Sequence, residues 1–389
     1  MHVIVDGVIY ARQRYGGINS YFNQVLPRIA RHAHTSVDLL LPREARGQPP
    51  GPPVRLLSRD FIPPRTGLSW RLDQKLEPVI ESLKLTIFGL WAKTKAQAVF
   101  HSTYFTALPI SLPHIAMAHD MNHELFPEAY SDPSGLWLRR RYPEYLRTAT
   151  RIIAVSHTTK NHVERYYSIA PELIDVVYHA VDRATFYVDR HEHGVRFLID
   201  ALGIHLPYIL YVGGRWHYKN FPTLLEAVAR SYRRTGLTLV VAGPSWNERE
   251  ALEIPAHAAA PALHLVPHPD NDLLRLLYNF ATAFVFPSLH EGFGIPLLEA
   301  MACGTPVVAS DTSIFREVAG SAAIYFNPYD PDDVARAIEQ CLDEQTGREY
   351  RSRGLLQVAQ YSWDTTSAQT RATYEKALGQ HPYSPVVQS

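Results

Sequence analysis

The sequence has few of the features that assign a protein to a specialised class. Its 389 residues include only two cysteines, Cys303 and Cys341, which excludes a secreted disulfide framework and favours a reducing cytosol. Its apolar runs are shorter than the roughly 18 residues of a membrane-spanning helix, and its first residues predict a strand rather than a signal peptide. Lysine plus arginine and aspartate plus glutamate both number 38, so the charge balance indicates no nucleic-acid partner. We therefore expect a cytoplasmic protein.

Sequence signatures of metal and dinucleotide sites are also missing. The 19 histidines are scattered without a spacing such as HExxH, so we expect no metal site. No GxGxxG motif follows the first strand of either half of the chain, which argues against an NAD enzyme, and we expect no cofactor. The remaining composition, with 46% hydrophobic and 20% charged residues, is typical of a soluble globular protein long enough for two domains.

Two successive blocks of alternating strands and helices make up most of the sequence. In the first block we expect strands at residues 2–8, 37–41, 98–100, 115–118, 152–155 and 175–177, and helices at 21–32, 71–90, 136–150 and 159–167. In the second we expect strands at 208–212, 237–242, 263–266, 283–286, 306–310 and 322–326, and helices at 221–233, 271–279, 296–303, 332–343 and 363–378. This alternation predicts an α/β fold with two Rossmann-like parallel-sheet domains facing across a cleft.

The expected domain limits follow from these blocks. Residues 1–185 form the first domain and residues 205–362 the second, and both consist of the alternating elements. Residues 186–204 are polar and without a buried strand, which is typical of a linker. Residues 363–389 form a last helix and a tail.

The most informative stretch lies between residues 283 and 311. A buried strand leads into a loop with Glu291, Gly292 and Gly294, and the helix that follows contains Glu299. The unpaired N–H groups at the start of this helix favour an anion such as a phosphate. The two carboxylates, with seven residues between them, are better suited to sugar or ribose hydroxyls. An ordinary strand–loop–helix unit with two surface glutamates fits the same pattern.

A second group of residues follows the first strand of the second block. Gly213 and Gly214 precede Arg215, and Lys219 comes four residues later. Arginine presents a planar fork to phosphate oxygens and lysine a compact charge, so the pair together with a helix start can neutralise a diphosphate without a metal. If the sheet is parallel, both can converge on the helix that follows Glu291. The alternative is a surface arginine and lysine beside a helix cap.

The first block contains weaker signals. Gly16 and Gly17 lie between a strand and a helix that Asn19 or Ser20 can cap, which is a further candidate phosphate site or an ordinary turn. His119 follows the strand at 115–118, and the carboxyl ends of parallel strands are where ligands bind, although a histidine can also simply close a loop there. The helix at 136–150 is basic and amphipathic, which is typical of a half-buried helix or of one that lies on an anionic membrane.

Taken together, these residues resemble the retaining glycosyltransferases of family 4, which have the GT-B fold. The resemblance is carried, in the family's order and spacing, by Gly16-Gly17, His119-Asp120, Ala154-Val155-Ser156, Gly214-Arg215 with Lys219-Asn220, and the stretch 287–310 with Glu291 and Glu299. The sequences of residues 118–128 and 211–221 are similar to those of bacterial transferases that build O-antigen and related polysaccharides, many of which are mannosyltransferases. One departure is His179-Ala180, where members often have Asn-Gly, which leaves any role of this segment in doubt.

The resemblance implies a role for each matching residue. Arg215 and Lys219 would hold the donor diphosphate, Glu299 the ribose, and Glu291 the transferred sugar. The remaining expected donor contacts are Gly16, Gly17, Val266, Pro267, His268, Gly292, Phe293, Gly294 and Ile295, with residues 266–268 bordering the base. His119 would contact the transferred sugar near the reaction centre. The last helix would cross back onto the first, acceptor-side domain.

The implied activity is retaining, metal-independent transfer of a hexosyl group from a nucleotide-diphosphate sugar. The best candidate is mannose from GDP-mannose, and the acceptor is a saccharide or lipid-linked oligosaccharide of surface polysaccharide synthesis. The first domain would then touch the inner face of the plasma membrane peripherally. The alternatives are a sugar-nucleotide epimerase, a phosphorylase-like enzyme of the same fold, or an inactive sugar-binding homologue.

Overall fold

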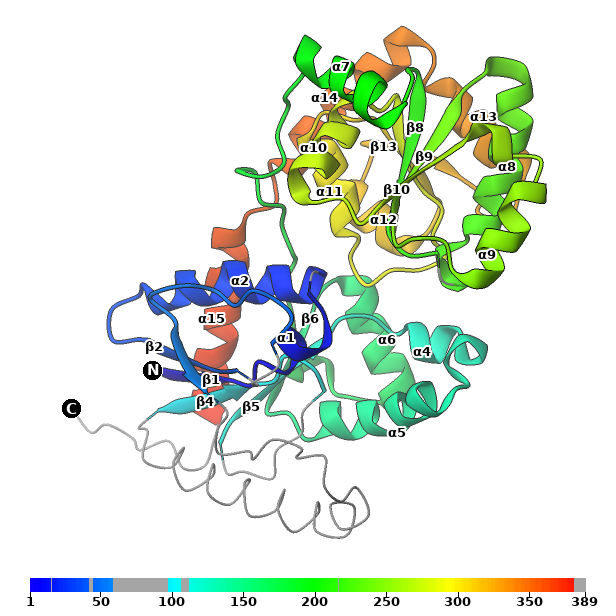
Figure 1. Ribbon diagram of the computed structural model, residues 1–389. Coiled ribbons are helices and arrows are strands. Elements are labelled where there is room, and N and C mark those ends of the chain that lie inside the picture. Colours follow the sequence, from blue (N-terminus) through cyan, green and yellow to red (C-terminus); the bar gives the residue numbers. More distant parts are fainter. Residues whose placement is uncertain (15, 42–44, 59–96, 106–111, 216, 381–389) are drawn as a thin grey trace, which may run out of the picture. The chain divides into compact units, whose positions relative to one another are not determined.

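The computed structural model describes residues 1–14, 16–41, 45–58, 97–105, 112–215 and 217–380, and its chain forms two compact units (Figure 1). Unit 1 consists of Met1–Tyr178 together with Trp363–Ser389, and unit 2 of His179–Ser362. Residues 186–204, which we expected to be a linker, lie within unit 2 and include the helix α7 (Glu192–Leu202). The helix expected at 71–90 lies outside the described residues.

Unit 1 is built on a seven-stranded parallel sheet in the order β3-β2-β1-β4-β5-β6-β7. The strands are β1 (His2–Val5), β2 (Ser36–Leu41), β3 (Arg55–Ser58), β4 (Ala98–His101), β5 (His114–Ala118), β6 (Arg151–Ala154) and β7 (Ile174–Val176). The four strands β1, β4, β5 and β6 are buried at every position, which explains their near-continuous apolar sequences. β1 lies between β2 and β4, so Val3 is paired with both Val37 and Val99.

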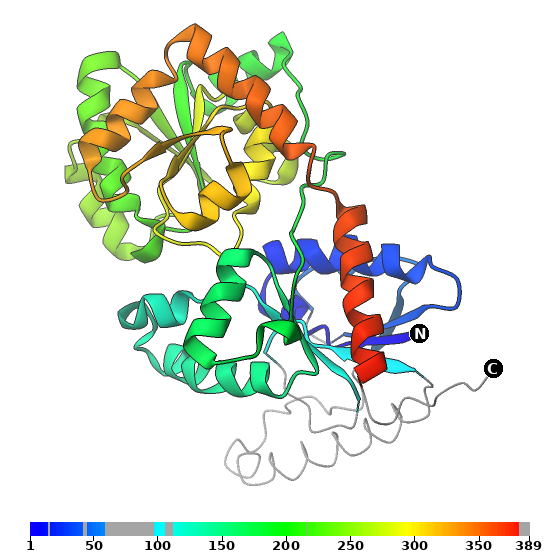
Figure 2. The ribbon, with the colours of Figure 1, turned by 180° about the vertical axis from the view of Figure 1, so that it is seen from behind.

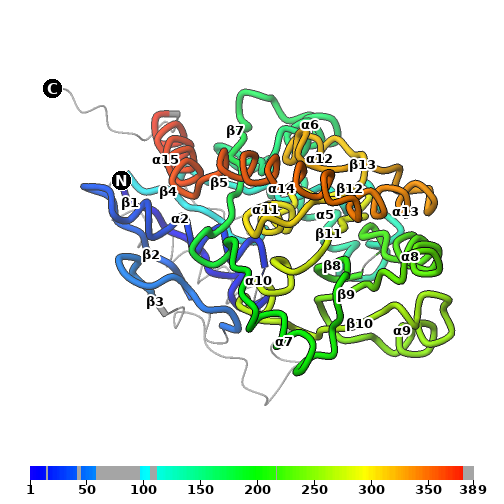
Figure 3. Tube along the Cα trace, turned by 90° about the horizontal axis from the view of Figure 1, so that it is seen from above, coloured from blue at the N-terminus to red at the C-terminus, as the bar shows by residue number. Residues whose placement is uncertain are grey.

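Helices cover the sheet of unit 1, and the last of them comes from the far end of the chain. The helices among the described residues are α1 (Val8–Arg12), α2 (Gly17–Ala30), α4 (Asn122–Leu125), η1 (Pro127–Tyr130), α5 (Pro133–Arg147), α6 (His157–Tyr167), η2 (Pro171–Leu173) and α15 (Trp363–Gln380). Figures 2 and 3 show α15 beside α2 and the strands of unit 1. The Tyr21 hydroxyl of α2 lies 2.6 Å from Thr370 Oγ1, and His101 Nδ1 at the end of β4 lies 2.6 Å from the Tyr374 hydroxyl.

Unit 2 repeats the architecture with a six-stranded parallel sheet in the order β10-β9-β8-β11-β12-β13. The strands are β8 (Tyr208–Val212), β9 (Thr238–Gly243), β10 (Leu263–Pro267), β11 (Ala283–Phe286), β12 (Val307–Ser310) and β13 (Ala323–Phe326). Beyond α7, its helices are η3 (His217–Lys219), α8 (Phe221–Thr235), α9 (Glu248–Glu253), η4 (Ile254–Ala256), η5 (Ala260–Ala262), α10 (Asn271–Phe280), α11 (Ile295–Ala302), α12 (Ser313–Ala319), α13 (Pro331–Gln340) and α14 (Glu344–Val358). A core cluster joins strand residues such as Val241 and Val285 to Leu224 of α8 and Ile338 of α13.

Parallel strands place all their carboxyl ends at one edge of each sheet, and this edge is where α/β proteins bind ligands. The predicted two parallel-sheet α/β organisation is confirmed. Within the described part of the chain, no helix is both long and apolar enough to span a membrane.

Candidate functional site

In unit 2 the turn after β8 needs glycine. Gly213 has a φ of +124°, a backbone conformation that residues with a Cβ rarely adopt. A Cβ on Gly243, at the end of β9, would clash with the carbonyl oxygen of Gly213. The two glycines therefore let the loops after β8 and β9 approach each other closely. This close approach fixes the position of the backbone from which the Arg215 side chain extends.

The Arg215 side chain is bound by protein acceptors. Its Nε and Nη2 donate to the two carboxylate oxygens of Glu250 at 2.7 and 2.8 Å, and Nη1 and Nη2 donate to the carbonyls of Pro244 and Ser245 at 2.9 Å each. The guanidinium carbon also lies 4.5 Å from the ring centroid of Trp246. We expected Arg215 to converge with Lys219 on the helix start; in this structure it is held by Glu250 instead. This fork-to-fork pair also lowers the pKa of Glu250.

Lys219 and Glu291 are brought together although they lie 72 residues apart in the sequence. Lys219 lies in η3, just after the glycine turn, and its Nζ donates to Glu291 Oε1 at 2.5 Å. The two side chains are only 16% and 14% exposed, so the pair is largely shielded from water. The ammonium group also lies 5.6 Å from the ring centroid of Phe286, the last residue of β11. The ammonium group can bind a phosphate, and the carboxylate beside it can accept a hydrogen bond from a sugar hydroxyl.

The start of α11, which we expect to be an anion site, is not capped by a side chain. Gly294 caps the helix with a φ of +96° and without a side-chain cap, and Pro296 lies in the first turn. Pro296 has no N–H and the Leu297 N–H donates to the Gly294 carbonyl at 3.0 Å, so the Ile295 N–H is the group of the first turn that can bind an anion. Next to it, the buried Phe293 ring packs edge-on against the rings of His179 and Tyr361, with ring centroids 5.3 and 5.9 Å apart. These contacts fix the loop from Glu291 to Gly294.

Glu299 lies in α11, where its Oε2 accepts a hydrogen bond from the Tyr278 hydroxyl at 3.0 Å. Burial raises the pKa of Glu299 to about 7, and the bond from Tyr278 opposes this shift. The protonated carboxyl can donate to a ribose hydroxyl, and the ionised form can only accept from one. Nothing in the sequence pointed to Tyr278, because it comes from the neighbouring helix α10.

The end of β10 and the residue after it are the positions expected beside the base. Val266 is buried at the end of the strand, while Pro267 and His268 are exposed. The His268 N–H donates to the Gly243 carbonyl at 2.8 Å, so this loop is tied to the same β9 turn that Gly213 approaches.

In unit 1, α2 begins earlier than we expected. Gly16 occupies the N-cap and Gly17 the first helical position, so the expected cap by Asn19 or Ser20 is wrong. The reason is local: the Asn19 side chain lies inside the first turn and accepts from Gln13 Nε2 at 2.7 Å, so it is not at the cap. With no side-chain cap, the first N–H groups of α2 are suited to an anion.

His119 follows β5 at the carboxyl edge of the same sheet. Burial lowers its pKa to about 4, so the imidazole is neutral at physiological pH. Its Nε2 is buried without a hydrogen-bond partner among the described residues. A neutral imidazole with an unused ring nitrogen is suited to a hydrogen bond with a ligand hydroxyl.

Asp6 and Ser288 are buried polar residues at strand ends that the sequence analysis did not name. Asp6, at the end of β1, accepts from the Thr103 N–H at 2.8 Å through Oδ1, whereas its Oδ2 has no partner in the described part of the chain. Ser288, between β11 and Glu291, has a fully buried hydroxyl that is likewise without a described partner. Both residues lie at the carboxyl ends of strands, and this position could have identified them as candidate site residues.

Among the described residues, no group of three or more histidines, cysteines, aspartates or glutamates is arranged to hold a metal ion.

Two family models match the sequence. Residues 15–185 match "Glycosyltransferase Family 4" and residues 201–354 match "Glycosyl transferases group 1". O-antigen chain mannosyltransferase B of Escherichia coli is 29% identical over 68% of this chain and 72% of its own length. D-inositol 3-phosphate glycosyltransferase of Frankia alni is 30% identical over 72% of this chain and 74% of its own length. The match to the serotype-specific mannosyltransferase WbdA of E. coli, at 30% identity, spans only 32% of that longer protein.

Solved structures share the fold at lower sequence identity. Sucrose-phosphate synthase from Thermosynechococcus elongatus superposes with a TM-score of 0.73 and 19% identity, over 97% of this chain and 99% of that one. Anabaena HepE in complex with UDP-glucose gives a TM-score of 0.69 and 18% identity, over 97% of this chain and 100% of that one.

Proposed function

This chain belongs to glycosyltransferase family 4, and from this premise we propose that it moves a hexosyl group from a nucleotide-diphosphate sugar to a saccharide or lipid-linked oligosaccharide, with retention of configuration. The observation that carries the proposal is the Lys219–Glu291 pair beside the uncapped N-terminus of α11. This one place offers a cation and N–H groups for a diphosphate and a carboxylate for sugar hydroxyls.

Mannose from GDP-mannose is the proposed donor. The support is the similarity to proteins described as O-antigen mannosyltransferases, and the product would be a bacterial surface polysaccharide. HepE, which has the same fold, is described in complex with UDP-glucose, so the experiment below includes both nucleotides.

We assign roles to the residues of unit 2 on this basis. Lys219 and the α11 N-terminus bind the diphosphate, with the amides of Gly292 and Gly294 beside them. Glu291 accepts hydrogen bonds from the transferred sugar, and Glu299 binds the ribose. Four of the five N–H groups of Arg215 already donate to protein oxygens. Arg215 therefore has one N–H of Nη1 left for the diphosphate, unless binding of the nucleotide sugar displaces Glu250.

For unit 1 the assignment rests on the resemblance and on the local environment of each residue. Gly16 and Gly17, at the uncapped start of α2, are proposed phosphate contacts. His119, neutral and with an unused Nε2, is the proposed hydrogen-bond partner of a hydroxyl on the transferred sugar.

The proposed reaction breaks the bond between the anomeric carbon and the β-phosphate oxygen and forms a bond from that carbon to the acceptor oxygen. Positive charge develops on the sugar ring, and negative charge on the departing phosphate is stabilised by Lys219 and the N–H at the start of α11. Retention requires the acceptor to attack from the face that the phosphate leaves. The departing phosphate oxygen then takes the acceptor proton, so no separate protein base is needed.

The acceptor chemistry suggests a peripheral contact of unit 1 with the cytoplasmic face of a membrane. Helix α5 exposes Leu136 and Trp137 at 45% and 48%, close to the exposed side chains of Arg140 and Arg141. Exposed apolar and basic side chains on one helix suit an interface with anionic lipid.

A thermal-shift screen of GDP, UDP, GDP-mannose and UDP-glucose tests the proposal. A donor present at 100 times its Kd should stabilise the protein by about 2.7 kcal/mol. Transfer with the best donor should continue in excess EDTA, and NMR of the product should show the anomeric configuration of the donor. The proposal fails if no nucleotide sugar stabilises the protein, or if EDTA abolishes transfer and added metal restores it.

A further inference from the structure

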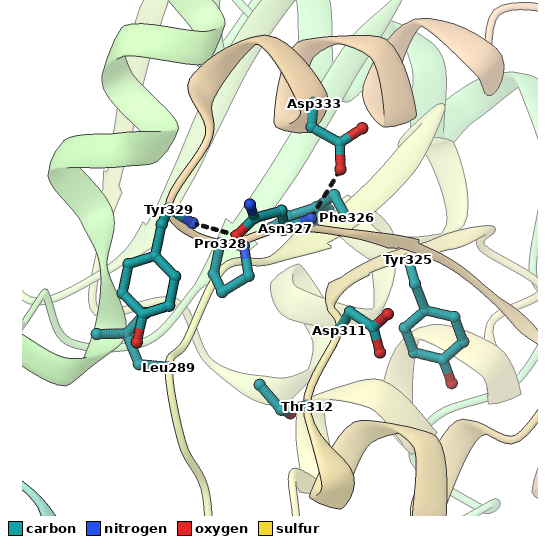
Figure 4. A pocket seen from close by; sticks show the side chains of 9 residues that line it. All are labelled: Leu289, Asp311, Thr312, Tyr325, Phe326, Asn327, Pro328, Tyr329 and Asp333. Atoms are coloured by element: carbon teal, nitrogen blue, oxygen red, sulfur yellow. Dashed lines mark hydrogen bonds between the residues drawn. The ribbon is translucent and has the colours of Figure 1, made fainter.

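Unit 2 has a pocket of about 560 Å³ that the proposed donor contacts do not use (Figure 4). It lies at the carboxyl ends of β12 and β13, beside the loop that follows β11. Its lining residues are Leu289, Asp311, Thr312, Tyr325, Phe326, Asn327, Pro328, Tyr329 and Asp333. Its volume falls within the range of about 300–1,000 Å³ that is usual for small-molecule sites.

The wall of the pocket from Phe326 to Tyr329 is held in place by hydrogen bonds. The Asn327 N–H donates to Asp333 Oδ2 at 2.8 Å, and Asn327 Oδ1 accepts from the Tyr329 N–H at 3.1 Å. Asn220, the residue after Lys219, donates from Nδ2 to the Pro328 carbonyl at 2.7 Å. The pocket is therefore largely pre-formed, and this wall is tied to the loop that holds Lys219.

The charges that line the pocket are compensated. Asp311 accepts from Nε and Nη2 of Arg316 at 2.6 and 2.8 Å, and Asp333 accepts from Arg336 Nε at 2.6 Å. These partners lower the pKa of both aspartates, so the carboxylates are ionised at neutral pH. Each carboxylate has about four acceptor positions, and the arginines leave some of them available. Such a site accepts hydrogen bonds from hydroxyls and disfavours a phosphate.

An aromatic ring forms one side of the pocket. Tyr329 is 75% exposed, and Figure 4 shows its ring beside Leu289 at the edge of the pocket. An exposed ring next to hydroxyl acceptors can pack on the apolar face of a pyranose while the acceptors bind its hydroxyls. The side-chain amide of Asn327, which is also exposed, adds a donor for a ring or glycosidic oxygen.

We propose that this pocket binds one neutral hexopyranose unit of the acceptor glycan. The inference rests on the proposed transferase function and adds to it a subsite in unit 2 for one sugar of the acceptor, whose other contacts the family resemblance assigns to the first domain. Leu289, in the pocket, is two residues before Glu291, so the bound glycan lies beside the loop that is proposed to hold the transferred sugar. Tyr329 supplies the stacking surface, and Asp311 and Asp333 accept hydrogen bonds from the sugar hydroxyls.

The test is direct binding of saccharides to the full chain without donor. The probes are neutral trisaccharides of mannose, glucose or N-acetylglucosamine, observed by saturation-transfer NMR and titrated by calorimetry. We expect at least one of them to bind. Tyr329→Ala should weaken that binding about tenfold, whereas Tyr329→Phe should stay within about twofold because it keeps the ring. Leu252→Ala is the control, since Leu252 is 80% exposed in the same unit and outside the pocket.

Each outcome of these measurements either supports or overturns the inference. Absence of binding for all three probes, an unchanged affinity in Tyr329→Ala, or displacement of the saccharide by GDP or UDP overturns the inference. In a transfer assay, Tyr329→Ala should raise the KM for the acceptor about tenfold and leave the KM for the donor unchanged. If saccharide binding depends on Tyr329 but no nucleotide sugar binds or turns over, the glycan site stands and the transferase proposal fails.

Discussion

Lys219 and Glu291 are the residues on which the proposed chemistry depends most directly. Lys219→Ala and Glu291→Ala should each reduce kcat/KM by a hundredfold or more, because each removes one strong contact to developing charge or to the transferred sugar. The measurement is steady-state transfer with the donor that the thermal-shift screen selects.

A matched pair of variants controls for the loss of an ion pair as such. Arg249→Ala and Glu253→Ala break an ion pair on α9 whose side chains are 84% and 60% exposed, and they should leave transfer unchanged. Near-normal rates in both Lys219→Ala and Glu291→Ala would refute the site assignment.

Glu299 makes the stability of the unliganded protein depend on pH. Its pKa is raised by burial from 4.5 to about 7, so between these pH values the folded state binds more protons than the unfolded state. The contribution of this group is therefore fully present below about pH 4.5 and is lost as the pH rises through 7. Relative to the wild type, Glu299→Gln should gain up to about 3 kcal/mol on going from pH 5 to pH 8.

Urea unfolding at several pH values measures this effect. Glu344→Gln is a suitable control, because the Glu344 side chain is 82% exposed, and it should show the same pH dependence as the wild type. Parallel stability curves for Glu299→Gln and the wild type would show that the Glu299 carboxyl is not perturbed.

At the scale of elements, the α11 N-terminus depends on the backbone of one glycine. Gly294 has a φ of +96°, and a Cβ there would lie 3.3–3.4 Å from the side chains of Leu297, Phe286 and Phe315. Gly294→Ala should therefore destabilise the protein by about 1–3 kcal/mol and weaken donor binding, because strain at the cap moves the Ile295 N–H.

Gly347→Ala provides a control for which we expect the opposite change in stability. It lies inside α14, and a Cβ there would meet only the Cys341 carbonyl oxygen at 3.5 Å. Gly347→Ala should stabilise the protein by about 0.5–1 kcal/mol, as is usual for a helix interior. Denaturant midpoints of the two variants give the comparison. Equal stability of Gly294→Ala and the wild type would show that the strained cap is unimportant.

At the scale of the whole molecule, unit 1 is completed by a helix from the end of the chain. Helix α15 provides partners to buried groups of unit 1, the Tyr21 hydroxyl and His101 Nδ1. A chain that stops at Ser362 should therefore fail to fold unit 1 cooperatively. Tyr374→Phe should cost about 1–3 kcal/mol, because it leaves the buried His101 nitrogen without its partner.

Limited proteolysis and thermal unfolding measure both changes. Tyr166→Phe serves as the control, since Tyr166 is 39% exposed and the loss of its hydroxyl should have little effect on stability. A truncated chain that unfolds as cooperatively as the full chain would contradict the role given to α15.

The sequence by itself determined the local features of this protein. Apolar runs such as residues 208–212 and 283–286 are typical of buried strands between helices, and the structure has β8 and β11 at those bounds. The spacing of Glu291 and Glu299 and the glycine before Pro296 are likewise local, so they indicated the α11 start and the family. Polar or short elements such as α9, α12 and α14 carried no such signal.

Only the tertiary structure decided which side chains meet. Lys219 pairs with Glu291 over 72 residues, Arg215 with Glu250 over 35, and Tyr21 with Thr370 over 349. The pocket of Figure 4 likewise joins residues from 289 to 333. A charged or polar side chain takes whichever partner the packing of the strands brings near, and strand order in a parallel sheet is set by crossovers rather than by neighbours in sequence. The sequence therefore named Arg215 as a cation, but only the fold placed Glu250 against it.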